Sequence, residues 1–183
     1  MIRLRFREIK TTQAAARLLA RAGGRLPYMS LIKLLYLADR QALVTLGKPV
    51  TWDLPVSMPH GPVLSRTLDL ITDEPEPGHA SYWHGHISRP DNYEVHLIEP
   101  PLGDQLSPAE EAVLDDVFHR FGHMNRWQLR DFTHTLPEWT DPHDSSVPIS
   151  IRDIILHQGV SVDDADAIIR DLLAEATADE VAV

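Results

Sequence analysis

The 183-residue sequence contains no cysteine. It therefore cannot form a disulfide framework, an iron–sulfur cluster or a thiolate zinc site. Because nothing in the sequence requires an oxidising compartment, the simplest expectation is a cytoplasmic protein.

The sequence also lacks the long apolar run that a signal peptide or a membrane span requires. At the N-terminus, MIRLRFREIK, the apolar residues are interrupted by Arg3, Arg5 and Arg7, whereas a signal peptide places its positive charges before an apolar core. We therefore expect neither a signal peptide nor an association with a membrane.

Positive charge is scarce, since the formal net charge is −10. Binding to nucleic acid depends on clustered lysine and arginine, so we expect no general nucleic-acid partner. Basic residues concentrate in the first forty positions, where they could receive an acidic partner surface or a phosphate-bearing ligand. Solvated faces of amphipathic helices explain the same residues more simply.

Recognisable catalytic motifs are missing as well. The sequence has no Gly-x-Ser-x-Gly, no glycine-rich phosphate loop and no cysteine nucleophile. Asp39 and His60 could form an acid–base pair if the chain between them folds back, but we favour a structural Asp39 that accepts backbone N–H groups of that returning chain. We therefore predict no enzyme and no cofactor.

Ten histidines provide the one alternative that involves a metal. If residues 82–88 and 93–98 are paired strands, His84, His86 and His96 could bind zinc from a single sheet face, with Glu94 as a further ligand. The pattern lacks the glutamate of a His-Glu-x-x-His site, so structural histidines are the favoured interpretation and we predict no native metal.

The composition, with 43% hydrophobic and 24% charged residues, is typical of one globular domain with a sizeable core. We predict a mainly α, compact helical domain with a small antiparallel β-hairpin insertion. A single domain is expected to cover residues 1–183, with an acidic tail that frays from about residue 176. The oligomeric state is left open.

The most informative stretch is residues 31–65. If residues 31–44 form a helix, leucine and alanine recur on one face and other apolar residues cover most of the rest. This pattern predicts a helix that is buried on most sides and ends at Gly47. Lys33, Tyr36 and Arg40 share one stripe of this helix, with Asp39 beside them, and we expect them to face a loop or a groove.

Residues 50–60 are predicted to return along this helix as an extended loop. Gly61-Pro62 then makes a turn, in which Pro62 can take the first position of the next helix. Further helices are expected at 12–22, 108–121, 126–135 and 151–157 and from residue 161 onward. The strands 82–88 and 93–98 form the predicted hairpin, the loops lie at 72–80 and 136–148, and Trp139 anchors the second loop.

Three spaced motifs resemble the Panacea domain, also called the SocA-like antitoxin domain. They are KLLYLAD at 33–39, GKPV at 47–50 and GPV at 61–63, and the resemblance is strongest over residues 11–71. It implies an α-helical antitoxin from a bacterial or phage toxin–antitoxin pair, which neutralises a cognate protein toxin by direct contact and without catalysis.

We predict that the groove between the central helix and the loop 50–62, together with the hairpin, docks on the toxin and blocks its active site. The predicted partner-binding residues are Lys33, Tyr36, Asp39, Arg40, Trp52, Asp53, His60, Gly61 and Pro62. Two alternatives remain. One is a metal-dependent hydrolase or a nucleotide-modifying enzyme that reverses the toxin's chemistry, and the other is an adaptor that delivers a partner to a protease.

Overall fold

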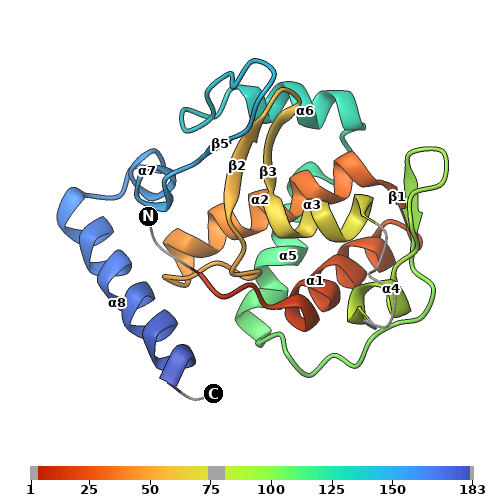
Figure 1. Cartoon of the computed structure of the whole chain (residues 1–183), viewed down its shortest axis with the longest axis horizontal. Helices are drawn as coiled ribbons and strands as arrows, with labels where there is room; N and C mark the ends of the chain where they lie inside the picture. The colour runs from red at the N-terminus through yellow and green to blue at the C-terminus, as the bar shows by residue number, and fades with distance from the viewer. Residues whose placement is uncertain (1–3, 74–80, 182–183) are drawn as a thin grey trace.

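The computed structural model describes residues 4–73 and 81–181, with side chains up to residue 178. Within these residues the chain forms eight helices and five short strands (Figure 1). The helices are α1 (Glu8–Arg21), α2 (Tyr28–Thr45), α3 (Ser65–Thr72), α4 (Tyr82–His86), α5 (Pro108–Phe121), α6 (Arg126–His134), α7 (Ile151–Leu156) and α8 (Val162–Val181). The strands are β1 (Arg25–Pro27), β2 (Pro55–Met58), β3 (Gly61–Leu64), β4 (Glu94–His96) and β5 (Val147–Pro148). The predicted fold class, mainly α with small antiparallel strands, is confirmed.

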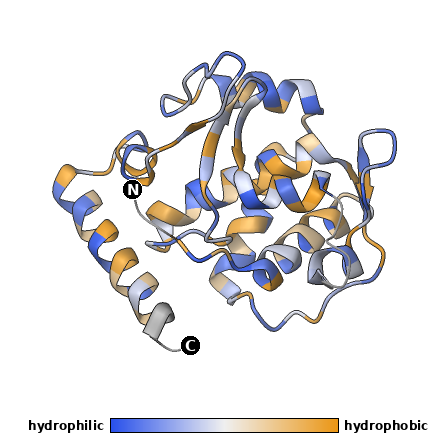
Figure 2. Ribbon diagram, viewed as in Figure 1, coloured by the Kyte–Doolittle hydropathy of each residue, from blue (hydrophilic) through white to orange (hydrophobic). Residues whose placement is uncertain are grey.

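Helix α2 is the centre of the fold, and it packs against α1, α5, α6, α7 and β3. Every residue from position 30 to 39 is buried, as expected for a helix whose whole circumference is apolar. Figure 2 shows apolar residues recurring along α2 and along the helices beside it. The helix ends before Gly47, whose φ of 73° is the left-handed conformation that the glycine was predicted to supply.

The segment after α2 forms a hairpin where a loop and a helix were predicted. Strands β2 and β3 pair antiparallel, from Pro55 opposite Leu64 to Met58 opposite Gly61, and β5 pairs with the other edge of β2. Residues 61–64 are therefore a strand, and the prediction that Pro62 opens a helix is wrong. Helix α3 begins at Ser65 instead, because Asp53 accepts hydrogen bonds from the first N–H groups there.

The predicted hairpin of residues 82–88 and 93–98 is wrong in its first strand. Tyr82–His86 is the short helix α4, and β4 pairs with β1 instead. A Glu8 carboxylate oxygen accepts the Trp83 N–H at 3.0 Å and holds the start of α4 against α1. What remains of the hairpin is a pair of isolated bridges, Ile87 with Leu97 and Asp91 with Glu94.

The helices of the second half begin where their capping residues predicted. Ser107 with Glu110, and Asn125 with Gln128, form complete capping boxes at α5 and α6, and Ser150 caps α7. Helix α8 extends to Val181, so the tail expected from about residue 176 is helical that far. The predicted loop 72–80 lies mostly outside the described residues, which resume at position 81.

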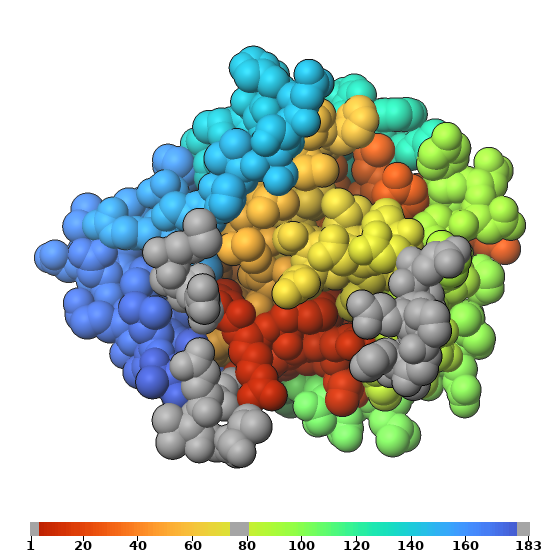
Figure 3. Space-filling view, viewed as in Figure 1, coloured from red at the N-terminus to blue at the C-terminus, as the bar shows by residue number. Residues whose placement is uncertain are grey.

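Helix α8 lies at one edge of the molecule, beside α7 (Figure 1). Its Glu175 carboxylate contacts Lys48 at 3.1 Å and Arg7 at 3.5 Å. On the face shown in Figure 3, the hairpin β2–β3 and α3 lie between the N-terminal segment and the loop around residue 145. Across the parts of the chain that the structure describes, no helix is long and apolar enough to cross a membrane.

Candidate functional site

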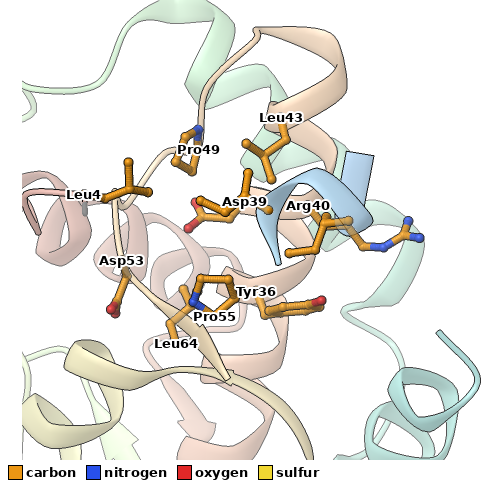
Figure 4. Close-up of a pocket in the computed structure, with 11 residues that line it drawn as sticks. Leu4, Tyr36, Asp39, Arg40, Leu43, Pro49, Asp53, Pro55 and Leu64 are labelled. Atoms are coloured by element: carbon orange, nitrogen blue, oxygen red, sulfur yellow. The ribbon is translucent and has the colours of Figure 1, made fainter. Parts of the chain in front are cut away.

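Most of the residues predicted to contact a partner are inside the protein. Of the nine, His60 is exposed and Arg40 is partly exposed; the buried ones are Lys33, Tyr36, Asp39, Trp52, Asp53, Gly61 and Pro62. Figure 4 shows Asp39 beside Pro49 and Tyr36 beside Pro55 of the returning chain. The cavity there measures about 10 Å³, which is room for one water molecule at most. The groove of the prediction is therefore filled by packed side chains.

Asp39 fixes the loop that returns along α2. One of its carboxylate oxygens accepts the backbone N–H groups of Val50 at 2.8 Å and Thr51 at 2.9 Å, and the other accepts the Thr51 hydroxyl. Burial raises the pKa of Asp39 to about 7, although these donors act in the opposite direction. The interpretation of Asp39 as an acceptor for the returning backbone is confirmed.

Lys33, in the first half of α2, holds the β2–β3 hairpin. Its Nζ donates a hydrogen bond to the Pro62 carbonyl at 3.0 Å, and its side chain is fully buried. Gly61 turns tightly over it with a φ of +96°, and a Cβ there would lie 2.9 Å from Nζ and 2.8 Å from the Thr133 hydroxyl. Burial lowers the pKa of Lys33 to about 7. Lys33 thus anchors β3, as its position on the stripe indicated.

Glu138 completes the stripe, and the sequence analysis missed it. Its carboxylate, fully buried, accepts hydrogen bonds from the Tyr36 hydroxyl at 3.1 Å and from Arg40 Nε at 2.6 Å. Burial and the neighbouring carboxylate raise the pKa of Tyr36 well above its usual value. The signal in the sequence was the stripe itself, because an arginine on an otherwise buried helix needs an acidic partner, which can come from another segment.

Trp139 anchors the loop that carries Glu138, as predicted. Its indole Nε1 donates to the Met58 carbonyl at 3.1 Å, and its ring stacks on His134 with a centroid separation of 4.2 Å. The loop after α6 is therefore attached both to α2 and to the tip of the β2–β3 hairpin.

Asp53 ties the same loop to α3. Its carboxylate accepts the N–H groups of Arg66 at 3.0 Å and Thr67 at 2.8 Å, and also the Thr67 hydroxyl at 2.7 Å. The preceding Trp52 has a φ of 59°, and the guanidinium of Arg7 lies 4.0 Å from the centre of its ring. Asp53 and Trp52 therefore shape the bend of the loop.

The alternative sites are not assembled. Asp39 contacts residues 50 and 51, whereas His60 lies beside Tyr28 at the far end of α2. Residues 28 and 39 are separated by about 16 Å along a helix that rises 1.5 Å per residue. The structure therefore does not bring together the acid–base pair that was considered as the alternative to a structural Asp39.

The strand arrangement behind the metal alternative is wrong, because His84 and His86 lie on α4 and only His96 lies on a strand. The His86 Nδ1 is 2.9 Å from the carbonyl oxygen of Glu99. Over residues 4–73 and 81–181, no group of three or more histidine or acidic side chains is placed to hold a metal ion.

The contacts that fix the loops to α2 and α3 lie within the part of the chain that matches a known family. The model of the SocA-like antitoxin, Panacea domain, matches residues 31–140, more than half of the chain. The chain belongs to this family. The match spans both partners of each contact that fixes the Panacea scaffold: Lys33 to Pro62, Asp39 to Thr51, Arg40 to Glu138 and Asp53 to Thr67.

Helices α1, α7 and α8 lie outside the part of the chain that matches the Panacea domain. No curated protein and no solved structure matches the chain. The family is therefore the source of the functional argument that follows.

Proposed function

We propose that this Panacea domain is the antitoxin of a bacterial or phage toxin–antitoxin pair, and that it neutralises its cognate protein toxin by direct binding and without catalysis. Membership of the SocA-like antitoxin family is the observation that carries this proposal.

The use of the buried charges supports a binding role. The carboxylates of Asp39, Asp53 and Glu138 and the amine of Lys33 all make hydrogen bonds to the protein itself. Each of them joins a loop to α2 or caps a helix, so each already has a structural role in the folded state. Such a scaffold holds surface loops rigidly, and loops on a rigid scaffold commonly carry recognition.

The mechanism in this proposal is occlusion of the toxin's active site. The tip of the β2–β3 hairpin, with the exposed His60, contacts the toxin. The other predicted residues act from behind: Gly61 and Pro62 shape the hairpin, Lys33 holds it, and Arg40 with Glu138 fixes the loop packed on its tip.

The test is growth rescue combined with co-purification. The product of the neighbouring gene is expressed in a bacterial host, with and without this protein, and the pair is then purified through a tag on one partner. We expect a toxic neighbour, restored growth and a stable complex. Rescue without a complex would contradict direct binding and would favour an enzyme that reverses the toxin's chemistry.

A stability control separates recognition from folding. The variant in which Lys33, Tyr36, Asp39 and His60 are all replaced by alanine should lose neutralisation, but three of these side chains are buried. His60→Ala alone changes an exposed side chain and should leave the thermal midpoint unchanged. If the quadruple variant stays folded and still neutralises, the hairpin surface is not the one that binds.

A further inference from the structure

Exposed aromatic residues and one arginine meet where four segments of the chain come together. These segments are the start of α2, the turn between β2 and β3, the turn before β4 and the start of α6. Figure 1 shows the tip of the hairpin beside α6. The residues surround a surface depression of about 260 Å³, and we call them the Arg126 surface: Tyr28, Met29, His60, Tyr93, Arg126 and Trp127.

The centre of this surface is a guanidinium between two rings. Arg126 lies 4.8 Å from the centre of the Trp127 ring and 5.2 Å from that of Tyr93. Trp127 is 44% exposed and Tyr93 is 62% exposed. Arginine, tryptophan and tyrosine are the residues most enriched at the energetic centres of protein interfaces.

The backbone at Tyr93 gives an independent reason to assign a function. Asn92 and Tyr93 have φ values of 51° and 67°, in the left-handed region where a two-residue turn prefers glycine at its second position. A tyrosine there is strained, and its exposed ring gains little from burial within the monomer. The turn is nonetheless held in place, because the Tyr93 carbonyl accepts the Tyr28 N–H at 2.9 Å.

Charge indicates what the surface binds. Several other arginines have carboxylate partners, as Arg25 does with Glu94 and Arg130 with Asp131. Among the residues that the structure describes, no carboxylate lies within ion-pair distance of Arg126. The cation is therefore available to a carboxylate of a partner, and the two rings beside it offer contact to apolar side chains.

A phosphate-bearing ligand fits this surface less well. At the start of α6, the N–H groups of Trp127 and Gln128 are already taken by the Asn125 side chain, at 2.9 and 3.0 Å. One arginine on a chain of net charge −10 also provides little attraction for a polyanion.

We propose that the Arg126 surface binds the cognate toxin through a segment in which an aspartate or glutamate lies next to an aliphatic or aromatic side chain. This inference rests on the proposed antitoxin function and identifies the surface that performs it. The carboxylate pairs with Arg126, and its apolar neighbour fills the depression between Tyr93, Trp127 and Met29.

The experiment measures toxin affinity for full-length variants by calorimetry. Arg126→Glu reverses the central charge, and Tyr93→Gly removes the ring while relieving the strained φ. Arg66→Glu is the matched control, since it makes the same charge change at an exposed position on α3. We expect a loss of at least about 30-fold for the two surface variants and less than about threefold for the control.

The variants also separate the possible failures. Tyr93→Gly should fold at least as stably as the wild type, so its lost affinity could not be attributed to unfolding. If the wild type binds the toxin and both surface variants bind equally well, the Arg126 surface is overturned while the antitoxin function stands. If the wild type binds no toxin, both proposals fail. A change in sedimentation without a change in toxin affinity would assign the surface to a second copy of this chain and would also overturn the inference.

Discussion

The buried amine of Lys33 should make the stability of this protein rise with pH between pH 7 and 10.5. Its pKa is about 7 in the folded state against 10.5 for a lysine in water, so the unfolded state binds a proton that the folded state has lost. The shift corresponds to about 5 kcal/mol over the whole window. Between pH 7.5 and 9.0 the free energy of unfolding should rise by about 2 kcal/mol on this account.

The comparison that isolates this effect is wild type against Lys33→Met. Methionine is similar in length to the lysine stem and has no ionisable group, so the variant should lose that 2 kcal/mol rise. Urea unfolding can be followed by the fluorescence of Trp52 and Trp83, both fully buried. Lys48→Met is the control, because the side chain of Lys48 is 39% exposed and the rise should persist. An equal rise in wild type and Lys33→Met would refute the argument.

Three further changes test the rest of the scaffold. Gly61→Ala places a methyl group within 3 Å of Thr133 and Lys33 at a φ of +96°, and it should cost about 3 kcal/mol in urea unfolding. Glu138→Ala leaves the partly exposed Arg40 and the buried Tyr36 hydroxyl without their acceptor and should cost about 3 kcal/mol, and a cost below 1 kcal/mol would count against the network. Burial raises the pKa of Asp39 to about 7, so the folded state keeps a proton that the unfolded state loses above about pH 4. The free energy of unfolding should therefore fall by about 2 kcal/mol from pH 5 to 7 on this account. Asp39→Asn should remove that fall in equilibrium unfolding.

The helical part of the fold was predictable because its signals are local. Apolar residues all around positions 31–44 predict a buried helix in any fold, and Ser107 and Asn125 set the starts of α5 and α6 through bonds within one turn. The role of Asp39 was predictable for a similar reason. A carboxylate on a buried helix must accept hydrogen bonds, and the returning loop is the nearest source of donors.

The errors lie where two local patterns fit the same residues. Trp83 and Ile87 are four apart, so they share a face in a helix and also in a strand, and packing against α1, including the contact with Glu8, favours the helix. Pro62 suits the first turn of a helix, but it is equally acceptable in the edge strand β3. In each case, helix or strand is decided by a contact with a distant segment of the chain, which the local sequence does not specify.

The candidate sites were least predictable, since they depend on contacts between distant segments. Glu138 and Arg40 are 98 residues apart in the sequence, and neither carries a motif that names the other. Tyr93 and Arg126 come from a turn and a helix start, each with a satisfactory local explanation. Their significance appears only when the guanidinium of Arg126 and the exposed rings are seen together.

Burial divides the chain into residues that determine stability and residues that can determine specificity. Lys33, Asp39 and Glu138 are buried, so altering them should lower the free energy of unfolding. The toxin affinity of the variant molecules that remain folded should change less. Tyr93 and Trp127 are exposed, so altering them should change affinity while stability stays within about 0.5 kcal/mol or improves. Within the part of the chain that the structure describes, no hydrogen bond joins the two groups. A double variant such as Asp39→Asn with Trp127→Ala should therefore show additive effects, and strong coupling between them would mean that the scaffold rearranges on binding.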